Sequence, residues 1–223
     1  MNVPTQFPRK NVYRTLQEMV DPAHTALLIV DMQKEYIGEG RRKLGLDPTP
    51  QQEAAKVIGG LVTVARRRGV LPIFIKNVVS PGGYTLSGVA IANELHVWGA
   101  YGVSTEGSEG SQFVEEINYQ PGDLIVTKNR NSAFYGTNLD LILRSSAIQT
   151  VVVTGQATFA CVETTARDAL CHDFYVTVVE DAVATVREEL NYHQASLQGL
   201  RHFLPVCGVA TSQEITTLWN SSP

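Results

Sequence analysis

The feature that most limits what this chain can fold into is a set of short apolar runs separated by longer helical segments. The runs lie at residues 26–30, 71–77, 124–127, 150–154, 174–179 and 204–207. They are apolar throughout rather than alternating, as expected for strands whose two faces are both covered. Between them, helices are predicted at 51–68, 138–145, 161–172, 187–202 and 212–219.

This alternation predicts an α/β fold, a doubly wound (Rossmann-like) six-stranded parallel sheet with helices on both faces. The length of 223 residues fits one domain, 1–223, in which residues 1–22 form an N-terminal extension. One long stretch, 78–110, is rich in Gly and Ser and carries no predicted strand or helix. It is interpreted as a loop that either shapes a substrate site or contacts another subunit.

Composition excludes several classes of protein. The net charge is −4 and no long basic run occurs, so nucleic acid and anionic membranes are not expected partners. No apolar run reaches the roughly 20 residues that span a bilayer. Three cysteines without regular spacing do not form a disulfide framework, and the first residues lack an apolar signal segment, so a cytoplasmic location is expected.

Three chemically reactive side chains follow three of the predicted strands. Asp31 follows the first, Lys128 ends the third, and Cys161 follows the fourth and opens a helix. Each has an ordinary reading as a turn former, a solvated lysine or a packed thiol. Parallel strands bring their carboxyl ends to one edge of the sheet, where an acid, an amine and a thiol could converge as a nucleophile with its partners. At a helix N-terminus, the thiol is further expected to favour its thiolate form.

Four segments of the chain together resemble the isochorismatase-like cysteine hydrolases. They are ALLIVDMQ at 26–33, VTKNRNSAF at 126–134, VTGQATFACV at 153–162 and TTARDA at 164–169. The resemblance implies a catalytic triad of Asp31, Lys128 and Cys161. It also implies a cis peptide bond between Gln156 and Ala157, with the N–H groups of Ala157 and Cys161 forming an oxyanion hole.

The function that the resemblance implies is hydrolysis of a C–N bond in a small amide, ureido or carbamoyl compound through a thioester. The alternative is an isochorismatase-type hydrolysis of a vinyl ether, which releases pyruvate. Relatives that bind a metal carry Asp and His in the segment matching residues 76–83, KNVVSPGG, which has neither. No metal and no other cofactor are therefore expected. The resemblance also implies that the protein forms a homodimer or homotetramer.

Candidate substrate contacts come from the residues that flank the triad. Gln33 and Tyr36 follow the aspartate, and Thr158 and Phe159 belong to the turn before the cysteine. Arg130 could hold a substrate carboxylate with two hydrogen bonds, or form a surface salt bridge. Phe134 and Tyr135 could wall an apolar pocket or pack in the core. The identity of the substrate stays open among carbamoyl amino acids, ureidoacrylate-like compounds, maleamate-like acids and biuret-like compounds.

Overall fold

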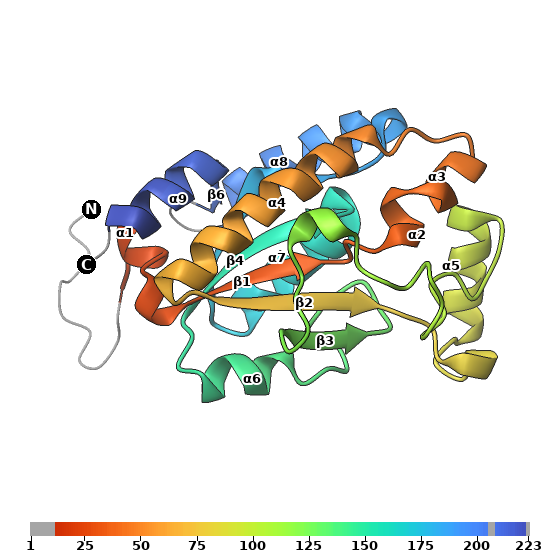
Figure 1. The fold of residues 1–223 in the computed structure, drawn as a ribbon, viewed down its shortest axis with the longest axis horizontal. Coiled ribbons are helices and arrows are strands. Elements are labelled where there is room, and N and C mark those ends of the chain that lie inside the picture. The colour runs from red at the N-terminus through yellow and green to blue at the C-terminus, as the bar shows by residue number, and fades with distance from the viewer. Residues whose placement is uncertain (1–11, 205–207, 222–223) are drawn as a thin grey trace.

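A six-stranded, all-parallel sheet forms the centre of the molecule. The computed structural model describes residues 12–204 and 208–221. Its strands lie in the order β3-β2-β1-β4-β5-β6 (Figure 1). They are β1 (Thr25–Val30), β2 (Leu71–Asn77), β3 (Leu124–Lys128), β4 (Thr150–Gln156), β5 (Tyr175–Ala184) and β6 (Val209–Ala210). The predicted fold class is confirmed.

Helices cover both faces of this sheet. They are α1 (Leu16–Met19), α2 (Lys34–Ile37), α3 (Glu39–Lys43), α4 (Thr49–Arg68), α5 (Gly88–Trp98), α6 (Leu139–Ser145), α7 (Glu163–Cys171), α8 (Leu190–Phe203) and α9 (Ser212–Ser221). Side chains of α4 and α9 pack on one face, and side chains of α6, α7 and α8 pack on the other. Figure 1 shows α4 crossing above the sheet and α6 below it.

The strands are the apolar runs because both of their faces are buried. Alternate residues of β1 enter opposite cores: Leu28 packs among the residues beneath α6 and α7, and Leu27 packs among those beneath α4. Every residue of β1 and β4 is buried. In a strand of this kind the two-residue alternation of polar and apolar side chains disappears, which is why these segments read as continuous apolar runs.

The stretch 78–110 is more ordered than the sequence indicated. It contains α5, which begins after Ser87, whose hydroxyl accepts a hydrogen bond from Ala90 N at 3.2 Å, and ends at Gly99 in the left-handed conformation. No residue of α5 is buried. Ile91, Leu95 and Trp98 recur at helical spacing, but they lie in a stretch rich in Gly and Ser, which favoured its interpretation as a loop.

The last strand also differs from its prediction. It was expected at 204–207, whereas β6 is Val209–Ala210 and pairs with Val178 and Val179 of β5. Leu204 directly follows α8, and 205–207 lie outside the described residues. A strand of two residues is too short for an apolar run to place. No helix in the described ranges is long and apolar enough to cross a membrane.

Candidate active site

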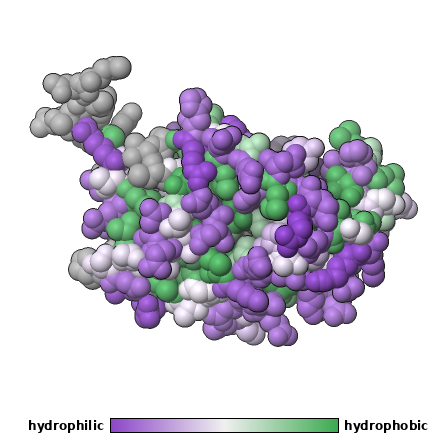
Figure 2. Space-filling model, turned by 90° about the horizontal axis from the view of Figure 1, so that it is seen from above, coloured by the Kyte–Doolittle hydropathy of each residue, from purple (hydrophilic) through white to green (hydrophobic). Residues whose placement is uncertain are grey.

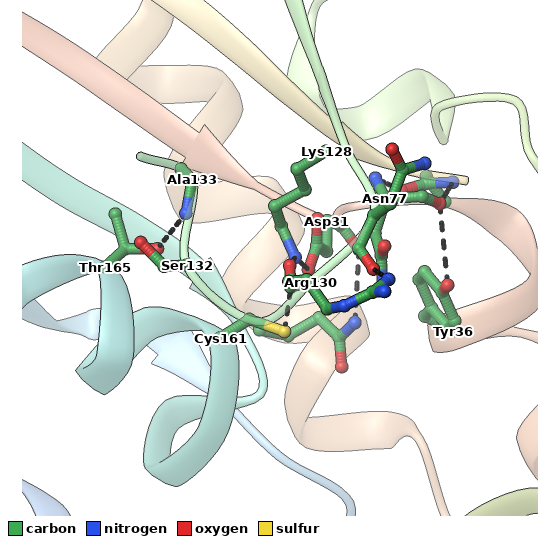
Figure 3. Close-up of polar contacts among 12 residues, drawn as sticks. Asp31, Tyr36, Asn77, Lys128, Arg130, Ser132, Ala133, Cys161 and Thr165 are labelled. Atoms are coloured by element: carbon green, nitrogen blue, oxygen red, sulfur yellow. Dashed lines mark hydrogen bonds and ion pairs between the residues drawn. The ribbon is translucent and has the colours of Figure 1, made fainter. Parts of the chain in front are cut away.

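The three reactive side chains meet at the carboxyl edge of the sheet (Figure 3). Asp31 follows β1, Lys128 is the last residue of β3, and Cys161 lies in a π-helical turn, residues 158–162, between β4 and α7. The strands of Asp31 and Lys128 are not neighbours, because β2 lies between them. Lysine has a side chain long enough to reach across the intervening strand.

The ammonium group of Lys128 is the centre of this cluster. Its Nζ lies 2.8 Å from Asp31 Oδ2, 3.4 Å from Cys161 Sγ and 2.9 Å from the carbonyl oxygen of Arg130. An ammonium has three N–H donors, and these three contacts engage all of them. The side chains of Lys128 and Asp31 are 0% and 1% exposed. A buried charge pair of this kind holds its partners in one geometry, because separating them in a low dielectric is costly.

Backbone contacts fix the position of Asp31. Its φ of 54° lies in the left-handed region, which aspartate tolerates better than most residues. Its N–H donates to Ile75 O at 3.1 Å, and its carbonyl accepts from Gln33 N at 2.9 Å and from Gln156 Nε2 at 3.2 Å. Gln156 is held in turn by Gln51, whose Nε2 donates to Gln156 Oε1 at 2.7 Å. A left-handed residue held by this many contacts is typical of a functional site.

The protonation states of the cluster follow from burial and from mutual charge. Burial, together with the Asp31 carboxylate, raises the pKa of Cys161 to about 12 despite the opposing effect of Lys128. Burial also raises the pKa of Asp31. For Lys128 burial acts to lower the pKa, but Asp31 and Cys161 outweigh it and raise it. The thiolate expected at a helix N-terminus is therefore not the resting form, since burial and the neighbouring carboxylate dominate.

One carboxylate oxygen of Asp31 has no hydrogen-bond partner among the described residues. Asp31 Oδ2 contacts the ammonium, whereas Oδ1 is buried and accepts no hydrogen bond from the described residues. Burying an acceptor without a partner is costly, so such atoms need an explanation. This oxygen keeps a free lone pair that a proton or a hydrogen-bond donor of a ligand can use.

The turn before Cys161 has the predicted cis peptide bond between Gln156 and Ala157. Ala157 borders the cavity described below, and within 12–204 and 208–221 no backbone carbonyl accepts a hydrogen bond from its N–H. Gly155, which precedes the cis peptide bond by one residue, has φ 115°, and a Cβ there would lie 2.1 Å from Val30 O. Only glycine allows β4 to approach β1 this closely while turning toward the cysteine.

A cavity of about 670 Å³ opens over the cluster. Asp31, Cys161, Gln156 and Ala157 border it on the side of the sheet, and the helix α5 borders it opposite. A volume of this size accommodates a small organic molecule. The stretch 78–110, for which two roles were left open, therefore supplies one wall of the cavity.

Three of the predicted substrate contacts border this cavity: Tyr36, Arg130 and Phe159. Tyr36 is buried and its hydroxyl donates to Asn77 O at 3.5 Å. The guanidinium of Arg130 donates to the carbonyl oxygens of Thr85 and Asn129 at 3.1 and 2.6 Å.

The other four predicted contacts do not border the cavity. Gln33 is buried and its Nε2 donates to Ser104 Oγ at 2.7 Å and to Asn77 O at 2.9 Å, so it ties neighbouring loops together. Thr158 is buried, and its hydroxyl lies 2.8 Å from Nδ1 of His193.

Phe134 and Tyr135 point to the core and to solvent, respectively. Phe134 is 6% exposed and stacks on His172 with 4.9 Å between ring centroids. Tyr135 is 70% exposed. Neither residue walls the cavity, because the chain after β3 borders it only from Asn129 to Asn131 and Phe134 then packs against His172.

Among the cavity residues that sequence reasoning missed are two that form a stacked pair. Trp98, at the end of α5, and Arg41, in α3, stack with 3.8 Å between the guanidinium carbon and the ring centroid. No sequence pattern brings together residues from two segments this far apart. Within 12–204 and 208–221, no group of three or more His, Cys, Asp or Glu side chains is placed to hold a metal ion.

Comparison with known proteins agrees with this architecture. A family model described as Isochorismatase domain matches residues 25–214. N-carbamoylsarcosine amidase from Thermoplasma acidophilum is 31% identical with a TM-score of 0.66, over 85% of this chain and 96% of that chain. An isochorismatase-like hydrolase from Alkaliphilus metalliredigens is 26% identical with a TM-score of 0.70, over 89% of this chain and 97% of that chain.

A structure named cysteine hydrolase, from Pseudomonas syringae pv. phaseolicola 1448A, has a TM-score of 0.79 at 23% identity. It covers 97% of this chain and 100% of that chain, and at this identity it supports the fold alone. The family model matches most of the chain and therefore shows the family as well as the fold. The chain belongs to the isochorismatase-like hydrolase family.

Proposed function

We propose that this hydrolase cleaves the C–N bond of a small amide, ureido or carbamoyl compound through a thioester on Cys161. The observation that carries the proposal is the buried contact of Lys128 Nζ with both Asp31 Oδ2, at 2.8 Å, and Cys161 Sγ, at 3.4 Å. A thiol and a carboxylate that both contact one buried ammonium beneath a cavity are the parts of an activated nucleophile.

In the first half of the reaction, the thiol proton passes to Asp31. Its free oxygen, Oδ1, is available to accept the proton, and Lys128 stabilises the thiolate that forms. The sulfur then attacks the carbonyl carbon of the substrate. The protonated carboxyl returns its proton to the leaving nitrogen, so that ammonia or an amine departs and a thioester remains.

The negative charge that develops on the carbonyl oxygen needs hydrogen-bond donors. The N–H of Ala157 borders the cavity without a partner among the described backbone carbonyls. Together with the N–H of Cys161 it would form the oxyanion hole, and one such donor can contribute roughly 3 kcal/mol to transition-state stabilisation.

In the second half, water hydrolyses the thioester. The oxygen of the water attacks the acyl carbon while Asp31, again a carboxylate, takes a proton from this water. Asp31 then passes the proton to the departing sulfur. Each group thereby returns to its starting form. The chemistry needs no group beyond these side chains, water and the substrate.

Two further observations support this choice of bond. Cys161 borders the cavity and contacts Lys128, as a nucleophile must. A similar protein, at 31% identity, is named an N-carbamoylsarcosine amidase, so a carbamoyl group is a reasonable first choice of substrate.

The test is a screen for ammonia release from small amides, ureas and carbamoyl acids. Cys161→Ser should abolish release, and Cys171→Ser should leave it unchanged, since Cys171 is an exposed free thiol outside the cavity. A covalent acyl adduct on Cys161 should be trapped by acid quenching and detected by mass spectrometry. Full turnover by Cys161→Ser would refute the proposal. If isochorismate instead yields pyruvate with both variants, the enzyme is the ether hydrolase.

A further inference from the structure

The side chain of Arg41 is buried beside the cavity without a partner for its charge. Arg41 is 6% exposed, and its Nε is buried with no hydrogen-bond partner. Across residues 12–204 and 208–221, the guanidinium makes no ion pair within 4.0 Å. A buried, unpaired cation is costly in free energy, so a position of this kind indicates a missing anion.

The contacts of Arg41 leave its edges available to a ligand. One face of the guanidinium stacks on Trp98 at 3.8 Å, and Trp98 in turn packs against Tyr36 with 5.4 Å between ring centroids. All three residues border the cavity. Stacking fixes the plane of a guanidinium but uses none of its N–H donors, which lie in that plane.

The nearby acidic side chains are occupied elsewhere. Glu94 borders the cavity, and its Oε2 accepts a hydrogen bond from Gly102 N at 2.7 Å. Glu189, whose negative charge acts to raise the pKa of Arg41, accepts a hydrogen bond from the Thr185 hydroxyl at 2.5 Å. Neither forms an ion pair with Arg41.

Arg130 is the other arginine at the cavity, and its situation differs. Its Nη1 donates to two backbone carbonyl oxygens, of Thr85 and Asn129, and its side chain is only partly buried. These bonds stabilise the wall of the cavity and leave fewer donors for a ligand. The substrate carboxylate expected on Arg130 is therefore better placed on Arg41.

We propose that Arg41 binds a carboxylate of the substrate, so that the enzyme acts on small amide or ureido acids rather than on neutral amides and ureas. This inference rests on the proposed function for its reaction, but the binding of the anion is independent of turnover. A carboxylate matches the planar fork of a guanidinium with two parallel hydrogen bonds. The stacked aromatic rings would contact the carbon chain between the carboxylate and the scissile bond.

The first experiment uses alkylation of Cys161 and needs no turnover. Iodoacetate, 3-bromopropionate and 4-bromobutyrate are each compared with their neutral amides, and the acid-to-amide rate ratio at Cys161 is divided by the same ratio for glutathione. We expect this normalised ratio to exceed 10 for at least one chain length. Arg41→Gln should reduce it at least tenfold, and Arg41→Lys, which keeps the charge without the fork, should retain part of it.

The matched control is Arg42→Gln, which removes the same charge from the next residue of α3. Arg42 points away from the cavity, where its Nη2 donates to Gln52 Oε1 at 3.3 Å, so its replacement should leave the ratio unchanged. A normalised ratio near 1 at every chain length would overturn the proposal. So would an equal loss in Arg41→Gln and Arg42→Gln, which would show a general charge effect.

The second experiment separates this inference from the proposed reaction. On paired acid and neutral substrates, Arg41→Gln should raise KM for the acid by 10-fold or more and change kcat little, and its loss of kcat/KM should be at least tenfold larger for the acid than for the neutral compound. If wild type shows acid-selective alkylation but releases no ammonia, the anion site stands and the amidase proposal fails. If ammonia is released from neutral compounds as readily as from acids, the amidase proposal stands and the carboxylate site at Arg41 fails. Melting temperatures confirm that each variant is folded.

Discussion

Replacing Asp31 by asparagine should make Cys161 more reactive toward alkylating agents, although it should abolish hydrolysis. The pKa of Cys161 is raised to about 12 by burial and, among the other causes, by the Asp31 carboxylate. Asparagine keeps the shape and a hydrogen-bonding oxygen but carries no charge. Lys128 would then act on the thiolate without a competing anion, and the pKa of Cys161 should fall.

The size of the effect follows from the distances. Lys128 Nζ lies 2.8 Å from Asp31 Oδ2 and 3.4 Å from Cys161 Sγ, so the oxygen and the sulfur are at most about 6.2 Å apart. At an effective dielectric constant of about 20, two charges that far apart repel by about 2.7 kcal/mol. This corresponds to about 2 pKa units, or about 100-fold more thiolate below the pKa.

The increase in rate is smaller than the increase in thiolate. A thiolate of lower pKa is a weaker nucleophile, with a Brønsted slope of about 0.4–0.5, so about tenfold faster alkylation is expected. The assay follows iodoacetamide labelling from pH 6 to pH 9 by peptide mass spectrometry, which distinguishes Cys161 from the exposed Cys171. The labelling rate should rise with pH in wild type throughout this range.

Cys171 is the internal control, since its labelling should be the same in both proteins. Equal or slower labelling of Cys161 in Asp31→Asn would refute the electrostatic argument. It would mean that burial alone sets the pKa of the thiol and that the carboxylate has no part in it. Loss of ammonia release in the same variant tests the separate claim that Asp31 transfers protons.

Further predictions concern the stability of the folded chain. Gly155→Ala should lower the free energy of unfolding by at least 1–3 kcal/mol and lower the activity, because its Cβ would lie 2.1 Å from Val30 O at φ 115°. Gly60→Ala is the control, since Gly60 is exposed in a helix and has nothing within 4 Å of an added Cβ. This change should raise the free energy of unfolding by about 0.5–1 kcal/mol, and thermal denaturation measures both effects. Phe134→Ala should cost about 3–5 kcal/mol in chemical denaturation and leave KM unchanged, since the ring is 6% exposed in the core. Tyr135→Ala, at a residue that is 70% exposed, should change neither quantity, and an altered KM in either variant would contradict the placement of both residues outside the cavity. The expected homodimer or homotetramer stays a prediction that light scattering can test.

The surface at α5 is relevant to that last measurement. Figure 2 shows hydrophobic residues exposed at the end of the molecule that α5 forms, and Val89 and Val97 of this helix are 82% and 42% exposed. Both residues also border the cavity. If another subunit covered α5, it would also cover one wall of the cavity, so a change in oligomeric state would be expected to change activity.

The strands and the triad could be predicted because their signals are local. A strand with both faces covered must be apolar at every position, so β1 and β4 are recognisable without knowledge of their neighbours. Asp31 and Lys128 stand where such runs end, and a parallel sheet brings run ends together. The helix α5 was not recognised, because its apolar residues Ile91, Leu95 and Trp98 lie in a stretch whose Gly and Ser content favours a loop.

The substrate contacts could not be inferred from proximity in sequence. Of seven candidates chosen beside the triad, Gln33, Phe134, Tyr135 and Thr158 do not border the cavity. Neighbours along a turn point in different directions, and only the packing of the following segment decides which side chains face the opening.

By itself, the sequence determined the sheet and the edge at which Asp31, Lys128 and Cys161 come together, since both depend on apolar runs and the residues that end them. The tertiary structure alone decided how these groups share charge and what surrounds them. Burial and the carboxylate keep the Cys161 thiol protonated, against the expectation for a helix N-terminus. The stacking of Arg41 on Trp98 joins α3 to α5, more than fifty residues apart, and no local pattern records a contact of that kind. Desolvation and long-range packing exist only once the chain has folded, and here they set both the pKa of Cys161 and the shape of the cavity that it borders.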